Sequence, residues 1–279
     1  MVHFIFPTNF SKTTRGIIAT FMREILQAQP SQNIEVTLLH AYGVPTSGVH
    51  MMRNISEKLR ETAQEDIQYE LQILKRELGH FNNLRINTWI AEGSLSNVLS
   101  RFQSDSGPAL VVMGLRSEGN FTRSIAGMSS AKLVNQLKDS VLFLPENKKF
   151  SRIQNITFAT DLQDFSNQRD FIEFLGFARF FGAEINFVHI DNGKVQQPER
   201  RFEEIFLPAL QKFSVPYKFQ KLQASDVSDA IQGYAEQTNS QLIAIIERDD
   251  NFFIDFFRAN VGDEIVESRR FPLLMISEN

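Results

Sequence analysis

Two segments of this chain, HFIFPTNFS at residues 3–11 and NITFATDLQDFS at residues 155–166, decide the fold between them. Each begins with apolar and β-branched residues, reaches a threonine that is followed by Asn9 or Asp161, and ends in a phenylalanine–serine pair. A helical pattern follows in both halves, over residues 13–27 and 167–181. Repetition on this length scale predicts two copies of one domain.

The rest of each half continues the alternation of strands and helices. Further strands are predicted at residues 33–42, 84–93, 109–114 and 140–146, and again at 183–191, 217–225, 241–247 and 271–278. Helical patterns lie between them, because apolar residues recur there at helical spacing. Such alternation is typical of an α/β protein with parallel strands. We therefore expect two repeated, open, five-stranded parallel-sheet domains with helices on both faces, Rossmann-like in plan, at 1–147 and 151–279.

Composition excludes several classes of protein. The chain has 279 residues, a formal net charge of −4 and no cysteine, so disulfides and thiol chemistry are excluded. Without a basic stripe, a nucleic-acid partner is not expected. No apolar stretch approaches the roughly 20 residues needed to cross a membrane, and we expect no signal peptide in the first ten residues. We expect a cytoplasmic protein with no membrane partner.

A glycine-containing loop follows the predicted strand at 109–114, within the stretch VVMGLRSEGNFTRSIAGMSSAKL at residues 111–133. The apolar run ends at Gly114, a polar loop follows, and Gly127 opens a helical pattern. Backbone N–H groups at the start of a helix are unpaired and carry positive dipole, so they can bind a phosphate. The pattern predicts phosphate binding in the first half.

Ligands of open parallel sheets bind at the carboxyl ends of the strands, near the point where the strand order reverses. In the first half these ends are predicted at Pro7-Thr8-Asn9, His40-Ala41 and Met113-Gly114. In the second half they are Thr160-Asp161, His189-Ile190 and Ile246-Glu247. The two histidines allow a catalytic or metal-binding interpretation, but a hydrogen-bonded structural role is favoured because no ligand-spaced partner accompanies them.

These features resemble those of the universal stress proteins, and nearly the whole chain is similar to a tandem member of that family. The resemblance rests on the segment Pro7–Ser11, the strand-end histidine His40, and the loop that begins at Gly114. It implies the adenine nucleotide alpha hydrolase-like fold. In nucleotide-binding members the loop reads Gly-x2-Gly-x9-Gly-Ser/Thr.

The loop of the first half keeps part of that motif. Its four positions fall on Gly114, Ser117, Gly127 and Met128, of which the two glycines match. Ser129 follows Met128 and offers a hydroxyl in its place. Arg116 is a candidate to balance phosphate charge, although a plain surface role is favoured for it. The resemblance also implies that the first-strand aspartate contacts the adenosine moiety. Here that residue is Asn9, which trades an acceptor for a donor.

The second half departs from the motif differently. It retains Asp161, but the sequence from the end of its fourth predicted strand reads IIERDDNFFIDFFRANVGDEIV (245–266), with no glycine until Gly262. Glu247, Asp249 and Asp250 put negative charge where a triphosphate would bind, which opposes binding. One helical face is predicted to carry phenylalanines, for which ordinary packing in the core and at the domain interface is favoured and filling of the vacated site or contact with a partner is the alternative: Phe252, Phe253, Phe256 and Phe257.

The resemblance implies a cytosolic stress-response protein that binds ATP or another adenine nucleotide weakly, in the first domain only. It also implies domain pairing through the closing strands at 141–144 and 273–276, with a homodimer as a further state. The alternative is a protein-interaction scaffold that uses the phenylalanine-rich last helix. The sequence has no G-x-S-x-G segment and no Walker lysine. We therefore expect no enzyme and no metal, and rank an adenylate-forming or nucleotidyl-transfer activity lowest.

Overall fold

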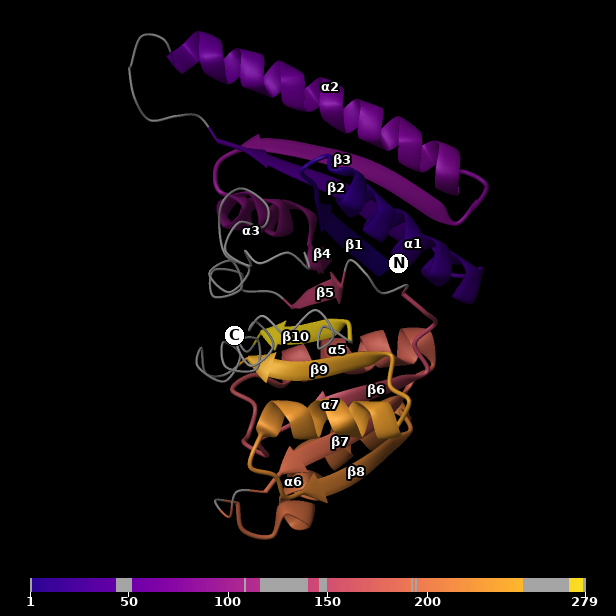
Figure 1. Ribbon diagram of the computed structural model, residues 1–279, viewed down its shortest axis with the longest axis vertical. Coiled ribbons are helices and arrows are strands. Elements are labelled where there is room, and N and C mark those ends of the chain that lie inside the picture. Colours follow the sequence, from indigo (N-terminus) through magenta and orange to yellow (C-terminus); the bar gives the residue numbers. More distant parts are fainter. Residues whose placement is uncertain are drawn as a thin grey trace. The chain divides into compact units, whose positions relative to one another are not determined.

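The structure is a computed structural model that describes residues 2–43, 52–107, 109–115, 140–145, 150–191, 193, 195–247 and 271–277. The chain forms two compact units, Met1–Asp139 and Ser140–Asn279, called unit 1 and unit 2 below (Figure 1). None of the described helices is both long and apolar enough to cross a membrane.

Unit 1 is a parallel sheet with three described helices. Its elements are β1 (Val2–Pro7), α1 (Lys12–Ala28), β2 (Ile34–Tyr42), α2 (Met52–Leu78), β3 (Leu84–Glu92), α3 (Leu95–Ser106) and β4 (Leu110–Leu115). The strands lie in the order β3-β2-β1-β4, and every pair is parallel. The chain runs outward from β1 to β3 and then returns to the other side of β1, so the strand order reverses between β1 and β4.

Unit 2 repeats this plan. Its elements are β5 (Val141–Pro145), β6 (Asn155–Ala159), α5 (Gln168–Phe181), β7 (Glu184–Ile190), α6 (Pro198–Phe213), β8 (Tyr217–Leu222), α7 (Val227–Gln237), β9 (Leu242–Glu247) and β10 (Leu273–Ser277). The order is β5-β10-β9-β6-β7-β8, parallel from β8 to β10, with the reversal between β6 and β9. The predicted α/β class with a mostly parallel sheet is confirmed.

Strand β5 behaves differently from the expectation. The sequence pattern makes it the fifth strand of the first domain, but it runs antiparallel to β10, with Phe143 opposite Leu273, and belongs to unit 2. All five of its residues are buried, so this apolar strand needs close packing partners. The limits 1–147 and 151–279 stay a prediction, since the compact units follow strand pairing rather than the repeat.

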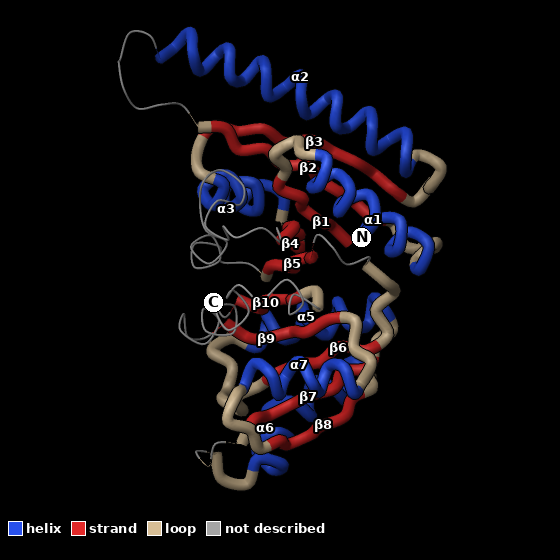
Figure 2. The backbone as a smooth tube through the Cα atoms, in the orientation of Figure 1, coloured by secondary structure: helices blue, strands red, loops and turns tan. Residues whose placement is uncertain are grey.

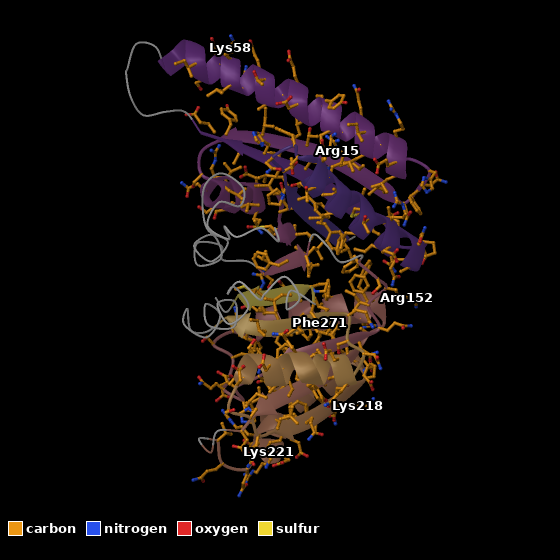
Figure 3. All side chains as sticks on the ribbon, in the orientation of Figure 1. Arg15, Lys58, Arg152, Lys218, Lys221 and Phe271 are labelled. Atoms are coloured by element: carbon orange, nitrogen blue, oxygen red, sulfur yellow. The ribbon has the colours of Figure 1, made fainter. Side chains whose placement is uncertain are left out.

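Helices cover both faces of each sheet, as expected. In unit 1, α1 and α2 lie on connections that run outward from β1 to β3, whereas α3 lies on the connection that returns from β3 to β4. Because both kinds of connection are right-handed, α3 lies on the opposite face of the sheet from α1 and α2. In unit 2, α7 lies in front of the strands and α5 behind them (Figure 2). The outer strand β8 is charged: Lys218 Nζ lies 2.7 Å from Glu184 Oε2, and Lys221 Nζ lies 3.4 Å from Glu199 Oε1 (Figure 3).

Phenylalanine fills both cores, but unevenly. In unit 1, Phe21 of α1 packs edge-on against Phe4 and Phe6 of β1, with ring centroids 5.4 and 5.8 Å apart. In unit 2, the ring of Phe158 on β6 lies within 6 Å of four others: Phe171, Phe174, Phe187 and Phe206. Seventeen of the 26 phenylalanines follow residue 150, and this core accounts for much of that excess.

The outer helices of unit 1 are joined by a buried ion pair. Arg15 of α1 donates from Nη2 to Glu70 Oε2 of α2 at 2.6 Å and from Nε to both carboxylate oxygens at 2.9 and 3.0 Å. Glu70 is fully buried, and its hydrogen bond to the guanidinium raises the pKa of Arg15. The corresponding helices of unit 2 meet through Phe171 and Phe206, whose rings lie edge-to-face at 5.1 Å.

Candidate functional site

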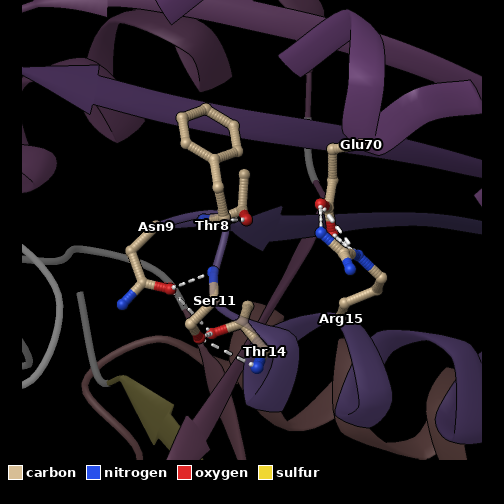
Figure 4. A network of polar contacts seen from close by, with 7 residues as sticks. Thr8, Asn9, Ser11, Thr14, Arg15 and Glu70 are labelled. Carbon is tan, nitrogen blue, oxygen red and sulfur yellow. Dashed lines mark hydrogen bonds and ion pairs between the residues drawn. The ribbon is translucent and has the colours of Figure 1, made fainter. Parts of the chain in front are cut away.

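The candidate site begins at the turn that leaves β1. Thr8 is buried, and its N–H donates to the Leu39 carbonyl at 2.8 Å, which extends the pairing with β2. Its hydroxyl oxygen accepts from the N–H of Phe10 at 3.0 Å, and Phe10 adopts a left-handed φ of 62°. Ser11 then caps α1 by accepting from the N–H of Thr14 (Figure 4). The turn thus carries the chain from strand to helix in four residues.

Asn9 is the second residue of this turn, directly after Thr8. Its Oδ1 accepts from the N–H of Ser11 at 3.1 Å and from the hydroxyl of Thr14 at 3.0 Å. A backbone N–H only donates, so the carboxamide atom that faces Ser11 is the oxygen. The amide nitrogen therefore lies on the side away from the network, as Figure 4 shows.

His40 ties the ends of β1 and β2 together. Its Nδ1 lies 2.8 Å from the carbonyl oxygen of Thr8. A carbonyl only accepts, so Nδ1 carries the proton and donates. The imidazole also lies against the ring of Phe10, with centroids 4.3 Å apart. The structural role predicted for this histidine agrees with these contacts, and Ala41 follows it at the end of β2.

Gly114 lies near the end of β4, on the other side of β1. A Cβ atom at this position would come within 2.5 Å of the Ile17 Cδ1 of α1. The glycine therefore has a packing role, because it lets α1 lie close to the strand end. Met113, which precedes it, is buried.

These residues flank the point where the strand order of unit 1 reverses. Pro7, Thr8 and Asn9 leave the central strand β1, with His40 and Ala41 on one neighbour and Met113 and Gly114 on the other. The remaining predicted site residues lie outside the described residues: Arg116, Ser117, Gly127, Met128 and Ser129. Sequence reasoning missed Thr14 and Ile17, although the spacing of Ser11 and Thr14 is that of a helix cap.

The turn that leaves β6 in unit 2 has the same geometry. The N–H of Thr160 donates to the Val188 carbonyl at 3.0 Å, and its hydroxyl oxygen accepts from the N–H of Leu162 at 3.0 Å. Leu162 is left-handed with a φ of 60°, Asp161 Oδ1 accepts from the N–H of Gln163, and His189 Nδ1 donates to the Thr160 carbonyl at 2.9 Å. Each bond has its counterpart in unit 1.

The residue matched to Phe10 is therefore Leu162, and pairing Phe10 with Phe165 from the sequence was wrong. The left-handed position follows the threonine by two residues in both units, whereas the helix follows it by four residues in unit 1 and by eight in unit 2. The longer connection carries Phe165 into the core, where its ring stacks on Phe171.

The histidine at the strand end of unit 2 is more buried than its counterpart in unit 1. His189 is 3% exposed, and among the described residues its Nε2 has no hydrogen-bond partner, whereas His40 is half-buried. Leu110 pairs with Phe4 in unit 1, and Leu242 pairs with Ile156 in unit 2. Counting four residues along each strand, Ile246 of unit 2 therefore matches Gly114 of unit 1. The phenylalanines at 252–257 lie outside the described residues.

Unit 2 has an open pocket beside the turn that leaves β6, near two of the strand ends that the sequence predicted for it. Its volume is about 580 Å³, and it lies at the carboxyl ends of β6 and β7. Arg201 binds Asp164 on its wall, and that hydrogen bond raises the pKa of Arg201. The lining residues are Leu162, Gln163, Asp164, Val195, Gln196 and Arg201.

No family model matches the sequence, and no curated protein matches it either. Several solved structures do match, and each of the three described here covers 99% of this chain. A universal stress protein from Archaeoglobus fulgidus has 13% identity and a TM-score of 0.67, with 96% of that chain covered. A functionally unknown protein and a provisionally assigned universal stress protein, both from Pseudomonas aeruginosa, have 12% and 13% identity and TM-scores of 0.52 and 0.51, each with 92% covered. The chain therefore has the fold of the universal stress proteins along its whole length.

Proposed function

We propose that this chain is a cytoplasmic stress-response protein with two universal stress protein domains, the first of which binds an adenine nucleotide weakly. The full-length likeness to the A. fulgidus protein supports the domain plan. The second domain then serves as a structural partner, and the antiparallel register of β5 on β10 supports pairing of the domains through their closing strands.

The observation that carries the nucleotide proposal is the arrangement at the β1–β4 edge. Asn9 and Gly114 lie at the carboxyl ends of the two strands between which the order reverses, and ligands of open α/β sheets bind at such a point. Gly114 lets α1 lie close to the strand end, whereas the matched position in unit 2 holds Ile246, and His40 is half-buried where His189 is buried. These differences favour unit 1 as the nucleotide-binding unit.

A binding protein fits this edge better than an enzyme does. His40, the ionisable ring nearest the β1 turn, commits Nδ1 to a backbone carbonyl. Among the described residues no hydrogen bond links that ring to a serine, threonine or cysteine side chain, as activation of a nucleophile requires.

Titration calorimetry of the full chain with Mg-ATP tests the proposal. We expect one weak site per chain, with a Kd between roughly 0.1 and 1 mM, or about −5.5 to −4.1 kcal/mol. Gly127→Asp is expected to abolish binding, because it adds a carboxylate beside the triphosphate, whereas the control Gly262→Asp in the second half leaves it unchanged. Absence of heat at millimolar ATP rejects the nucleotide proposal.

A further inference from the structure

We propose that two copies of this chain associate through β3, the outermost strand of unit 1, as an antiparallel strand pair with its two-fold axis at Asn87 (Figure 1). The closing strands are already used within the chain, because β5 pairs with β10. The inference concerns how copies of the chain assemble, and it does not depend on nucleotide binding.

The first observation is the direction of the backbone groups of β3. Its start is joined to β2 by the Ile34 N–H, which donates to the Asn83 carbonyl at 2.9 Å, and its end by the Gly93 N–H, which donates to the Tyr42 carbonyl at 2.9 Å. Backbone groups alternate between the two sides of a strand, so the odd-numbered residues of β3 bond to β2 and the even-numbered ones point away from it. In the part of the chain that the structure describes, no hydrogen bond reaches these outward groups.

The second observation is that β3 lacks the features that usually block the addition of a strand. Natural outer strands are short, or they carry lysine, proline or a central charge. Strand β3 has nine residues without lysine or proline, and its charged residues are Arg85 near one end and Glu92 at the other. The outer strand of unit 2, β8, has six residues, two of which are lysines. Of the two outer strands, β3 is therefore the one that is open to a partner.

The third observation is that β3 complements a second copy of itself on the face that carries α3. Trp89 is half-buried against Phe102 of α3, with ring centroids 5.1 Å apart, and Arg85 is exposed without an ion pair among the described residues. Within one strand Arg85 and Trp89 lie about 13 Å apart, so they do not meet. A two-fold axis at Asn87 sets Arg85 of each copy opposite Trp89 of the other, where the guanidinium can lie over the indole ring.

The opposite face of this strand pair is apolar. The same axis sets Leu84 opposite Ile90 of the other copy. It also sets Ile86 opposite Thr88, and all four side chains are half-buried in the single chain. Apolar and β-branched residues that face each other stabilise a strand pair. An axis at Thr88 would instead place Leu84 opposite Glu92, so the side chains favour the first register.

Helix α2 leaves room for the second copy. It packs against both β2 and β3, so its axis lies over these two strands rather than beyond β3. Neighbouring strands are about 4.8 Å apart, so the two-fold axis places the two copies of α2 about 10 Å apart. That is an ordinary separation for packed helices, and the contact has the closed two-fold symmetry that is commonest among homodimers.

Sedimentation equilibrium of the full chain tests whether it dimerises. We expect twice the chain mass of 32.0 kDa. Thr88→Pro should return the mass to that of one chain, because it removes an outward N–H and leaves the bonds to β2 in place. The matched control Lys221→Pro removes an outward N–H from β8 and should keep the dimer. Thermal melting checks that both variants fold.

Cysteine cross-linking tests the register, because the chain has no cysteine of its own. Asn87 faces its own copy with Cα atoms about 4.5 Å apart, a separation that a disulfide can span. Oxidation should therefore link two chains through Asn87→Cys, but not through Thr88→Cys or through Gln220→Cys on β8. A wild type with the mass of one chain, a dimer that survives Thr88→Pro, or a disulfide through Thr88→Cys in place of Asn87→Cys overturns the inference.

Discussion

The outer helices of unit 1 meet across the ion pair of Arg15 and Glu70, whereas those of unit 2 meet across phenylalanine rings. The strand order around β1 and around β6 is the same, and so is the turn that leaves each of these strands. The same arrangement of helices can therefore be held by an ion pair in one unit and by aromatic rings in the other. A buried ion pair contributes little net stability but is costly to break, whereas rings stabilise by the area they bury.

Phe206→Ala in unit 2 removes one side of the ring contact between the outer helices, and we expect the largest effect from it. Phe206 is fully buried and its ring packs against five others: Phe158, Phe165, Phe171, Phe187 and Phe202. Its loss should lower the free energy of unfolding by about 4 kcal/mol, measured by urea denaturation. The control Phe213→Ala, at the less buried end of α6, should cost far less. If both variants lost the same free energy of unfolding, the ring cluster around Phe206 would not be what stabilises unit 2.

Glu70→Gln breaks the corresponding contact in unit 1. The charge of Arg15 then has no buried counter-charge, and we expect a loss of about 3 kcal/mol. The matched control is Asp164→Asn, whose carboxylate is mostly exposed beside Arg201 and should cost at most about 1 kcal/mol. The double variant Arg15→Met with Glu70→Leu should recover most of the stability. Failure to recover it would assign the ion pair a net stabilising role.

Gly114→Ala sharpens the comparison at the strand end. The added methyl meets Ile17, which is the flexible end of a side chain, so we expect a loss of roughly 1 kcal/mol. Ile17→Val in the same chain should relieve part of it. Gly16→Ala is the control of opposite sign: it has open space in α1 and should stabilise by up to about 1 kcal/mol. If both substitutions shifted the melting temperature in the same direction, the contact between position 114 and Ile17 would not explain the loss.

The smallest expected effect depends on pH. Burial lowers the pKa of His3, and Glu35 raises it in part, so the unfolded chain binds a proton more readily than the folded one. The contribution of His3 is complete above the unfolded pKa near 6.5 and declines as the pH falls, by at most about 1.4 kcal/mol per pH unit. The matching position in unit 2 is Asn155, which lies five residues before Thr160 as His3 lies five before Thr8. Asparagine does not titrate, so unit 2 has no such pH dependence at this position. His3→Gln should flatten the stability of the chain between pH 7 and 5; an unchanged slope would exclude His3 as its source.

Most of the fold could be predicted from the sequence because it rests on local patterns. Apolar runs and helical spacing gave the strands and helices, and the repeat gave the number of copies. That β5 belongs to unit 2 could not be predicted from its own pattern, because an apolar strand fits either side of a sheet. Leu162 was missed for a related reason: a left-handed φ at a non-glycine residue leaves no mark in the sequence.

The site was predictable only in part. Strand-end residues such as Asn9 and His40 follow from the topology of parallel sheets. The contact of Gly114 with Ile17 and the ion pair of Arg15 with Glu70 depend on how helices dock, which the spacing of residues does not encode. The pocket beside Arg201 likewise joins two connections that are separated by about thirty residues of sequence.

The lysines of β8 have a consequence for the behaviour of the protein at high concentration. An outer strand carries unpaired backbone groups that can recruit a strand from another molecule and begin a fibril. Adding a strand beside Lys218 and Lys221 would require removing water from two ammonium groups that are already held by Glu184 and Glu199. The outer strand of unit 2 is thereby protected against aggregation by its own charges.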